Sequence, residues 1–114
     1  MDKINTGLGT TIRRMDFRNP IFQDGLNCTV RCGYKWANLR IGEKIILSSG
    51  REAIVEKIIV CRFKDLSEAD ISVEHDPNCR SKVGLFNYLA GIYPEFARDK
   101  ENSVVTVVYF RILT

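Results

Sequence analysis

Two polar residues that alternate along one short segment could carry chemistry in this chain. In the run CTVRC, residues 28–32, Thr29 and Arg31 lie two positions apart, so in an extended strand both side chains point to the same face. The planar arginine fork binds phosphates and base edges. A threonine hydroxyl is a nucleophile only when a neighbouring base or cation activates it. The pattern predicts a ligand contact at Arg31; a salt bridge to Glu74 or Asp70 is the alternative.

An aromatic and basic segment follows at once. Tyr34, Lys35 and Trp36 come directly after the strand, and aromatic rings beside cations stack the bases of single-stranded RNA. Packing inside the domain is the alternative for this single tryptophan. Residues 1–64 hold 12 Lys and Arg against 6 Asp and Glu, whereas residues 65–114 hold 5 against 8. This asymmetry favours a phosphate-rich partner, with four candidate contacts: Arg13, Arg14, Lys35 and Arg40.

The cysteine spacing and the first residues of the chain indicate whether the protein binds a metal and where in the cell it lies. The four cysteines form no CxxC pair, and His75 is the single histidine, so the spacing does not suit a zinc site. The first residues, MDKINTGLGTT, lack the apolar core of a signal peptide. No apolar run approaches the roughly 20 residues of a membrane span. We therefore expect a cytoplasmic protein with free thiols, no metal, no cofactor and no membrane partner.

One long hairpin is the expected spine of the fold. The branched runs Lys44–Leu47 and 53–63 flank a Gly-containing turn at 48–51. The alternation slips at Glu56 and Lys57, which predicts a bulge there. Further strands are expected at 10–17, 28–32 and 103–113, the last inside the sheet because it is apolar on both faces.

Helical segments separate these strands. A helical turn is predicted at 21–24, and a short helix after 66, where Ser67 and Asp70 can cap each other. A second helix is predicted from about 81 to 90, with Gly91 as a left-handed cap and Pro94 blocking continuation. Its apolar stripe indicates core packing: Leu85, Phe86, Leu89, Ile92 and Tyr93. The 114 residues suit one domain, 1–114, with residues 1–9 frayed.

The order of several short motifs resembles an ASCH domain of the PUA-like superfamily. The motifs lie between residues 17 and 113, at Gly25, 29–31, 41–43, 66–68, 92–94 and 109–110. The resemblance implies an α+β fold: a PUA-like small mixed β-barrel with two helices inserted before the last strand. It also implies a cleft between barrel and helices that binds RNA or modified nucleosides.

Some ASCH relatives are amidohydrolases that remove the acetyl group from N4-acetylcytidine. Their pattern is Gly-x-Lys-x-x-Thr-x-Arg, with Thr as the nucleophile, Lys as its activator and a later Glu as the acid/base. By this resemblance, Thr29 and Arg31 match the pattern, and Glu74 lies where that Glu belongs.

The activating lysine of that pattern is missing here. The gap between Gly25 and Thr29 is one residue short, so the lysine position falls on Leu26 or Asn27. Neither side chain can take a proton from threonine. Glu74 or Lys35 would have to activate Thr29 instead.

Three functions follow as alternatives. The first is a module that binds RNA or a nucleotide-like small molecule through Arg31. The second is an amidohydrolase acting on N4-acetylcytidine or a similar small amide, with Thr29, Glu74 and Lys35 as its catalytic residues. The third is a protein-interaction domain whose cleft has lost its ligand. If Thr29, Arg31 and Glu74 converge on one open cleft, Lys35 nearby would favour the enzyme and a broad basic face around the cleft would favour the RNA module. A filled cleft would favour the interaction domain.

Overall fold

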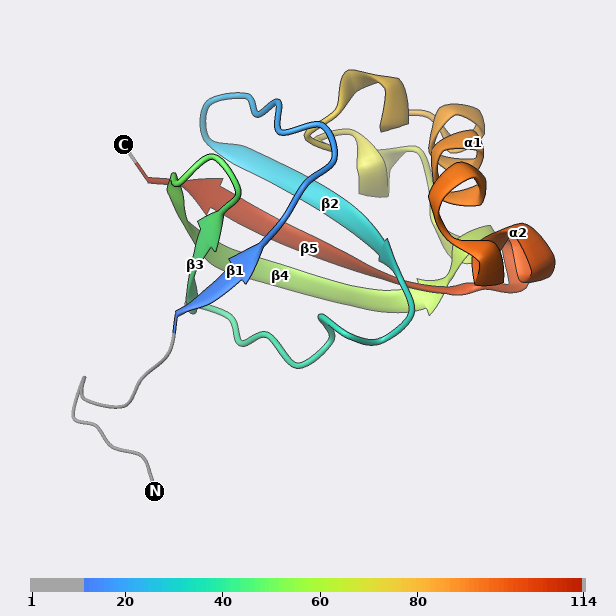
Figure 1. Ribbon diagram of the computed structural model, residues 1–114, viewed down its shortest axis with the longest axis horizontal. Helices are drawn as coiled ribbons and strands as arrows, with labels where there is room; N and C mark the ends of the chain where they lie inside the picture. Colours follow the sequence, from blue (N-terminus) through green and yellow to red (C-terminus); the bar gives the residue numbers. More distant parts are fainter. Residues whose placement is uncertain (1–11, 114) are drawn as a thin grey trace.

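The protein, seen here as a computed structural model of residues 12–113, is built around the expected hairpin (Figure 1). Five strands form one sheet in the order β1-β3-β4-β5-β2. Their bounds are β1 Arg13–Met15, β2 Leu26–Cys32, β3 Lys44–Leu47, β4 Glu52–Arg62 and β5 Val104–Ile112. β1 pairs with β3 in parallel, and the other neighbours are antiparallel. The predicted hairpin and the central place of the last strand are confirmed.

Among residues 12–113, the helical segments lie between β4 and β5, where two helices were predicted. They are α1 Lys82–Ile92, α2 Pro94–Asp99 and four 3-10 turns: η1 Phe63–Asp65, η2 Ala69–Ile71, η3 Pro77–Cys79 and η4 Lys100–Asn102. Figure 1 shows α1 and α2 together at the end of the sheet where β2 ends. The α+β class is therefore confirmed. Within residues 12–113, no helix has the length and apolar character needed to cross a bilayer.

The sheet buries a core on each of its faces. On one face, Leu85, Leu89 and Phe96 of the helices pack with Val105 and Val107 of β5. On the other face, residues of β1 and β3 and of the segment between β2 and β3 pack on β4 and β5. The alternation of β5 therefore supplies side chains to both cores, which explains its apolar sequence.

The predicted bulge in β4 is present. The pairing of β4 with β5 shifts register between Val55 and Lys57, next to Glu56. An extra residue in one strand bends it and increases its twist. The first residues of β4, 52–54, pair with β3. The rest of β4 extends beyond β3 and pairs with β5 alone.

The predicted barrel does not close. β1 pairs with β3 and β2 pairs with β5, but among residues 12–113 no ladder joins β1 to β2. The first strand spans three residues instead of 10–17, of which 10 and 11 lie outside the described residues. Aromatic packing takes the place of the missing ladder: the Phe17 ring lies 5.0 Å from the Phe22 ring and 6.0 Å from the Phe110 ring.

Two local predictions are wrong for identifiable reasons. Residues 21–24 form no helical turn, because the buried Asn27 side chain bonds both the N–H and the C=O of Gln23. Gly91 is no left-handed cap. It lies inside α1, which ends at Ile92, and Pro94 starts α2 after an extended Tyr93.

The predicted capping exchange is confirmed in a shorter helix. The Ser67 N–H donates to Asp70 Oδ2 and the Asp70 N–H donates to Ser67 Oγ, at 2.9 and 3.2 Å. The helix that follows is the 3-10 turn η2 rather than an α-helix. The frayed segment predicted at residues 1–9 lies outside the described residues.

Candidate functional site

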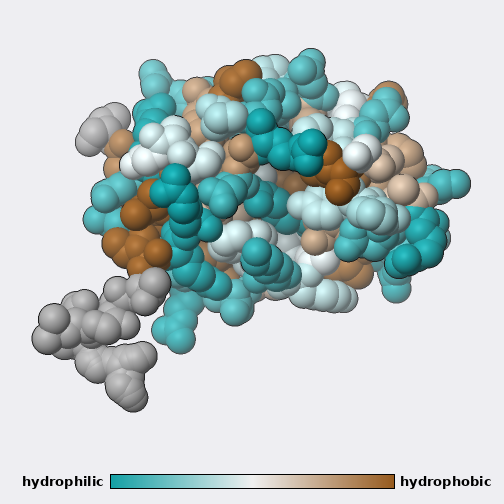
Figure 2. All heavy atoms as spheres, in the orientation of Figure 1, coloured by the Kyte–Doolittle hydropathy of each residue, from teal (hydrophilic) through white to brown (hydrophobic). Residues whose placement is uncertain are grey.

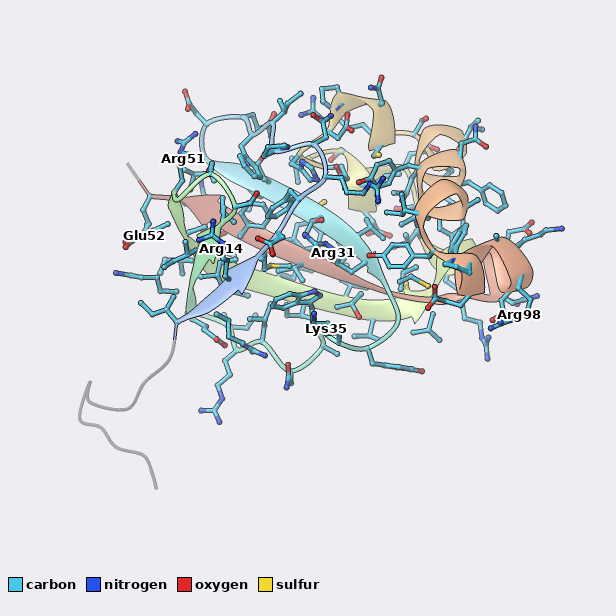
Figure 3. The ribbon with its side chains drawn as sticks, viewed as in Figure 1. Arg14, Arg31, Lys35, Arg51, Glu52 and Arg98 are labelled. Carbon is cyan, nitrogen blue, oxygen red and sulfur yellow. The ribbon has the colours of Figure 1, made fainter. Side chains whose placement is uncertain are left out.

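A cleft of about 230 Å³ lies where the barrel fails to close. Its walls are the segment that follows β1, the middle of β2, the segment containing Glu74, and the C-terminal half of α1. Three of the residues predicted from sequence line it together: Thr29, Arg31 and Glu74. Figure 3 shows Arg31 between β1 and α1.

Glu74 reaches the cleft because its backbone extends the edge of β2. The Cys28 N–H donates to Val73 O at 2.8 Å, and the His75 N–H donates to Cys28 O at 2.9 Å. This short parallel bridge places Glu74 beside Cys28. The Arg80 Nε donates to Glu74 O at 2.8 Å and fixes the segment from its other side. This segment is therefore an ordered wall of the cleft.

The Glu74 carboxyl is buried, with 3% of the residue exposed. Burial raises the pKa of Glu74 to about 8, since the charged form loses its hydration. The N–H groups of Asp76 and Val30 and the Arg31 charge oppose this shift, whereas the Asp76 charge adds to it. At pH 7 the carboxyl is therefore mainly neutral and carries one O–H donor.

His75 is a cleft residue to which the sequence analysis assigned no role there. Its Nδ1 lies 3.1 Å from Ile21 O, which makes Nδ1 the donor and Nε2 an acceptor. Nε2 lies 3.6 Å from Glu74 Oε1. Burial lowers the pKa of His75, so the ring is neutral beside a neutral carboxyl. The adjacency of His75 to Glu74 in sequence was the available signal.

Arg31 is held in place by groups on three sides. Its Nε donates to Thr29 Oγ1 at 3.1 Å, and one Nη donates to Asp16 O at 2.8 Å. Its guanidinium carbon lies 4.7 Å from the centre of the Phe17 ring. The Asp16 contact spans the gap between β1 and β2. The alternative salt bridge to Glu74 or Asp70 does not form among residues 12–113.

Two tyrosines of the α1 region form the opposite wall. Tyr88 and Tyr93 line the cleft together with Ile92, whereas the other members of the predicted apolar stripe, such as Leu85 and Leu89, pack in the core. Burial raises the pKa of both tyrosines, so they keep their hydroxyl protons at neutral pH. The spacing of Tyr88 and Ile92, four apart on one helix face, was a usable signal.

The aromatic and basic segment after β2 lies outside the cleft lining. The Trp36 residue is 9% exposed, and three cations lie within 6.0 Å of its ring centre: Arg13, Arg31 and Lys35. Its ring is therefore packed and covered, not open to a stacking base. Tyr34 is 66% exposed beside it. Lys35 lies over this ring at 5.3 Å and does not line the cleft with Thr29.

The other predicted phosphate contacts lie on or near β1. Arg13 pairs with Glu43 at 3.2 Å and donates to Asn38 at 2.8 Å. Arg14 donates to Ser48 O and pairs with Asp16, whose side chain is 81% exposed. Figure 3 shows Arg14 on β1 and Lys35 below Arg31 in this view, and Arg40 is exposed. Hydrophilic residues cover most of this face (Figure 2).

The two positions where the missing lysine could stand, 26 and 27, hold residues with structural roles. The Asn27 side chain clamps Gln23, as described above, and Leu26 packs against the core under the helices. Within residues 12–113, no lysine lines the cleft. Thr29 Oγ1 instead accepts a hydrogen bond from a cation, Arg31.

Comparison with known proteins gives structural matches. No family model matches the sequence, and no curated protein matches it. The chain is similar to the crystal structure of hypothetical protein PH0355, at 18% identity and a TM-score of 0.65, over 90% of this chain and 100% of that one. It is also similar to the ASCH domain from Lactobacillus crispatus JV V101, at 12% identity and a TM-score of 0.48, over 78% of this chain and 64% of that one. The likeness to PH0355 shows that these two chains share one fold.

Proposed function

We propose that this chain is a module that binds RNA or a nucleotide-like small molecule in the cleft beside β2. The observation that carries the proposal is the meeting of Thr29, Arg31 and Glu74 in one open cleft. A fixed guanidinium and a neutral carboxyl supply donors and an acceptor within a small space. An open cleft with these groups favours a ligand-binding role over an interaction domain with a filled cleft.

The neutral Glu74 carboxyl suits the edge of a nucleobase. A protonated carboxyl offers a donor and an acceptor side by side, and base edges present the complementary pairs. Proteins that take up a single base read its edge by hydrogen bonds and hold its faces between aromatic or apolar side chains. Tyr88, Tyr93 and Ile92 supply such walls. The volume of about 230 Å³ lies below the ~300–1,000 Å³ of most small-molecule pockets, which suits one base-sized group.

Basic residues near the cleft would contact the rest of an RNA strand. Figure 3 shows Arg14 and Lys35 near Arg31, Arg13 and Arg40 line a second pocket, and Tyr34 is exposed. Contacts of this kind add affinity without sequence specificity, and added salt weakens them because neutralised phosphates release counterions.

The test is binding of short single-stranded RNA, followed by fluorescence anisotropy at several salt concentrations. Affinity should fall as salt rises, and Arg31→Ala should weaken binding about tenfold or more, as expected for a lost charged hydrogen bond. Arg98→Ala is the matched control, because Arg98 is exposed on α2 and pairs with Asp99. Salt-independent binding, or an Arg31→Ala variant that binds as well as Arg98→Ala, would count against this site.

Amidohydrolysis is the second candidate, favoured by one observation. Thr29 and Glu74 line the same cleft, and a pKa of about 8 lets Glu74 exchange protons near neutral pH. Thr29, however, has a cation and no base on its hydroxyl, and a lost base costs a rate factor of about 10² to 10⁴. We expect N4-acetylcytidine incubated with the protein to be converted slowly or not at all, as judged by chromatography. Rapid conversion that Thr29→Ala abolishes would place the enzyme first.

A further inference from the structure

The Arg31 guanidinium carries a positive charge that no neighbouring carboxylate neutralises. Among residues 12–113, the ion pairs within 4.0 Å do not include Arg31. Burial is the largest influence on this group and lowers its pKa, yet an arginine stays protonated in proteins. A charge partly removed from water is costly unless a counter-ion offsets it. The cleft therefore holds a cation that an anion would stabilise.

The same guanidinium has one nitrogen left for a ligand. Nε is bonded to Thr29 Oγ1 and one Nη to Asp16 O, and the Phe17 ring lies against the plane. The other terminal nitrogen, Nη1, has no hydrogen-bond partner among residues 12–113. Since three contacts fix the group, the two N–H bonds of Nη1 have a set direction before any ligand arrives.

The groups around Arg31 also favour an anion. The Glu74 carboxyl is mainly neutral at pH 7, and the tyrosine hydroxyls of Tyr88 and Tyr93 keep their protons. Arg18 lies exposed at the rim of the same cleft. The other acidic residue that lines the cleft, Asp16, has a side chain that is 81% exposed and already paired with Arg14. The net charge of the side chains that line the cleft is therefore positive.

We propose that Arg31 Nη1 is the centre of an oxyanion subsite that takes the terminal phosphate of a nucleotide or of an RNA end. The nucleotide part of this ligand rests on the proposed function, whereas the oxyanion part rests on Arg31 and its neighbours. A terminal phosphate presents three oxygens and can enter a cleft of about 230 Å³ end-on. An internal phosphate brings a chain on both sides, for which a cleft of this volume has little room.

The test compares one single-stranded RNA hexamer in three forms: unphosphorylated, 5′-phosphorylated and 3′-phosphorylated. Binding is measured by titration calorimetry at constant ionic strength. One phosphorylated form should bind about tenfold tighter than the unphosphorylated form, the gain expected for charge-assisted hydrogen bonds to a fixed arginine. Arg31→Gln should remove this difference, whereas Arg98→Gln should keep it. Inorganic phosphate should compete with the phosphorylated form at lower concentration than acetate does.

The outcomes separate this inference from the proposed function. Equal, salt-sensitive binding of all three RNA forms would overturn the subsite and keep the RNA-binding module. Binding of inorganic phosphate that Arg31→Gln abolishes, without binding of any RNA form, would keep the subsite and overturn RNA as the ligand of the module. Acetate competing as well as phosphate would overturn phosphate as the ligand group. Thermal unfolding of both variants confirms that each is folded.

Discussion

Arg31 and Thr29 are bonded to each other along one strand: Arg31 Nε donates to Thr29 Oγ1 over 3.1 Å. Their side chains point to the same face because they lie two residues apart in β2. This bond gives Thr29 a role in positioning Arg31, which is separate from nucleophilic catalysis. Its hydroxyl helps to hold the guanidinium of Arg31 in place at the cleft.

The bond predicts different effects for two substitutions of Thr29. Thr29→Val keeps the shape but removes the acceptor, so RNA affinity should fall. A hydrogen bond to a charged group is worth ~1.5–3 kcal/mol, which sets the largest loss at about 10- to 150-fold. Thr29→Ser keeps the hydroxyl and should bind like the unmodified protein. Fluorescence anisotropy with single-stranded RNA measures both. If Thr29→Val bound RNA like Thr29→Ser, the hydroxyl would have no positioning role.

The raised pKa of Glu74 predicts that the free energy of unfolding decreases as the pH rises. Its pKa is about 8 in the folded protein against 4.5 as the ordinary value, so the folded form holds a proton that the unfolded form releases between these values. Stability therefore decreases from pH 4.5 to 8, with a slope of at most about 1.4 kcal/mol per pH unit from this group. The ionisable groups around Glu74 are Cys28, Arg31, His75, Asp76, Cys79, Arg80 and Tyr88.

Urea unfolding between pH 6 and 8 tests this linkage. Glu74→Gln cannot ionise, so its stability should change less over this range than that of the unmodified protein. The thiols do not contribute, because burial raises the pKa of Cys28 and Cys79 above their ordinary value of 9.0. Equal pH slopes for the unmodified protein and Glu74→Gln would show that Glu74 is ionised at neutral pH.

Local patterns predicted the fold where local rules decide it. The hairpin, the bulge beside Glu56 and the Ser67–Asp70 exchange depend on residues close in sequence, and each was predicted correctly. Closure of the barrel depends instead on whether β1 and β2 pair. That pairing fails because the Phe17 ring packs on Phe22 and Phe110, an arrangement that strand periodicity does not encode.

The candidate site divides in the same way. Thr29 and Arg31 could be paired from alternation alone, whereas Glu74 was found through the family resemblance. His75 and Tyr88 reach the cleft only because the bridge at Cys28 and the packing of α1 bring them there. The adjacency of His75 to Glu74 and the four-residue spacing of Tyr88 and Ile92 were signals in the sequence, but neither says which other segments these residues face in the fold.

Substitution of Asn27 should lower the stability of the fold, because its side chain holds the segment 21–24 in a non-helical conformation. Its buried side chain accepts from the Gln23 N–H at 3.1 Å and donates to Gln23 O at 2.8 Å. Asn27→Ala leaves both backbone groups without these partners and should cost about 1–3 kcal/mol in urea unfolding. Asn87→Ala, on the exposed face of α1, is the control and should stay within about 0.5 kcal/mol. Equal urea midpoints for the two variants would show that the two hydrogen bonds from Asn27 to Gln23 do not stabilise the fold.

Gly84 and Gly91 lie in the same helix and should respond oppositely to alanine. A Cβ atom on Gly84 would lie 2.0 Å from Asn78 O, a backbone atom of η3, so η3 must move away from α1. Gly84→Ala should therefore destabilise the protein by about 1–3 kcal/mol, as overpacking does. A Cβ atom on Gly91 meets nothing within 4 Å, so Gly91→Ala should add about 0.5–1 kcal/mol through helix propensity.

Urea unfolding of both glycine variants checks these signs, and RNA binding extends the test to the cleft. η3 follows Glu74 closely in sequence, and a shift of η3 should also disturb the Asp76 N–H that donates to Glu74 Oε1 at 2.7 Å. Gly84→Ala should thus weaken RNA binding, whereas Gly91→Ala should leave it unchanged. A Gly84→Ala variant as stable as Gly91→Ala would mean that η3 and α1 separate easily, and that their close packing does not hold Glu74 in place.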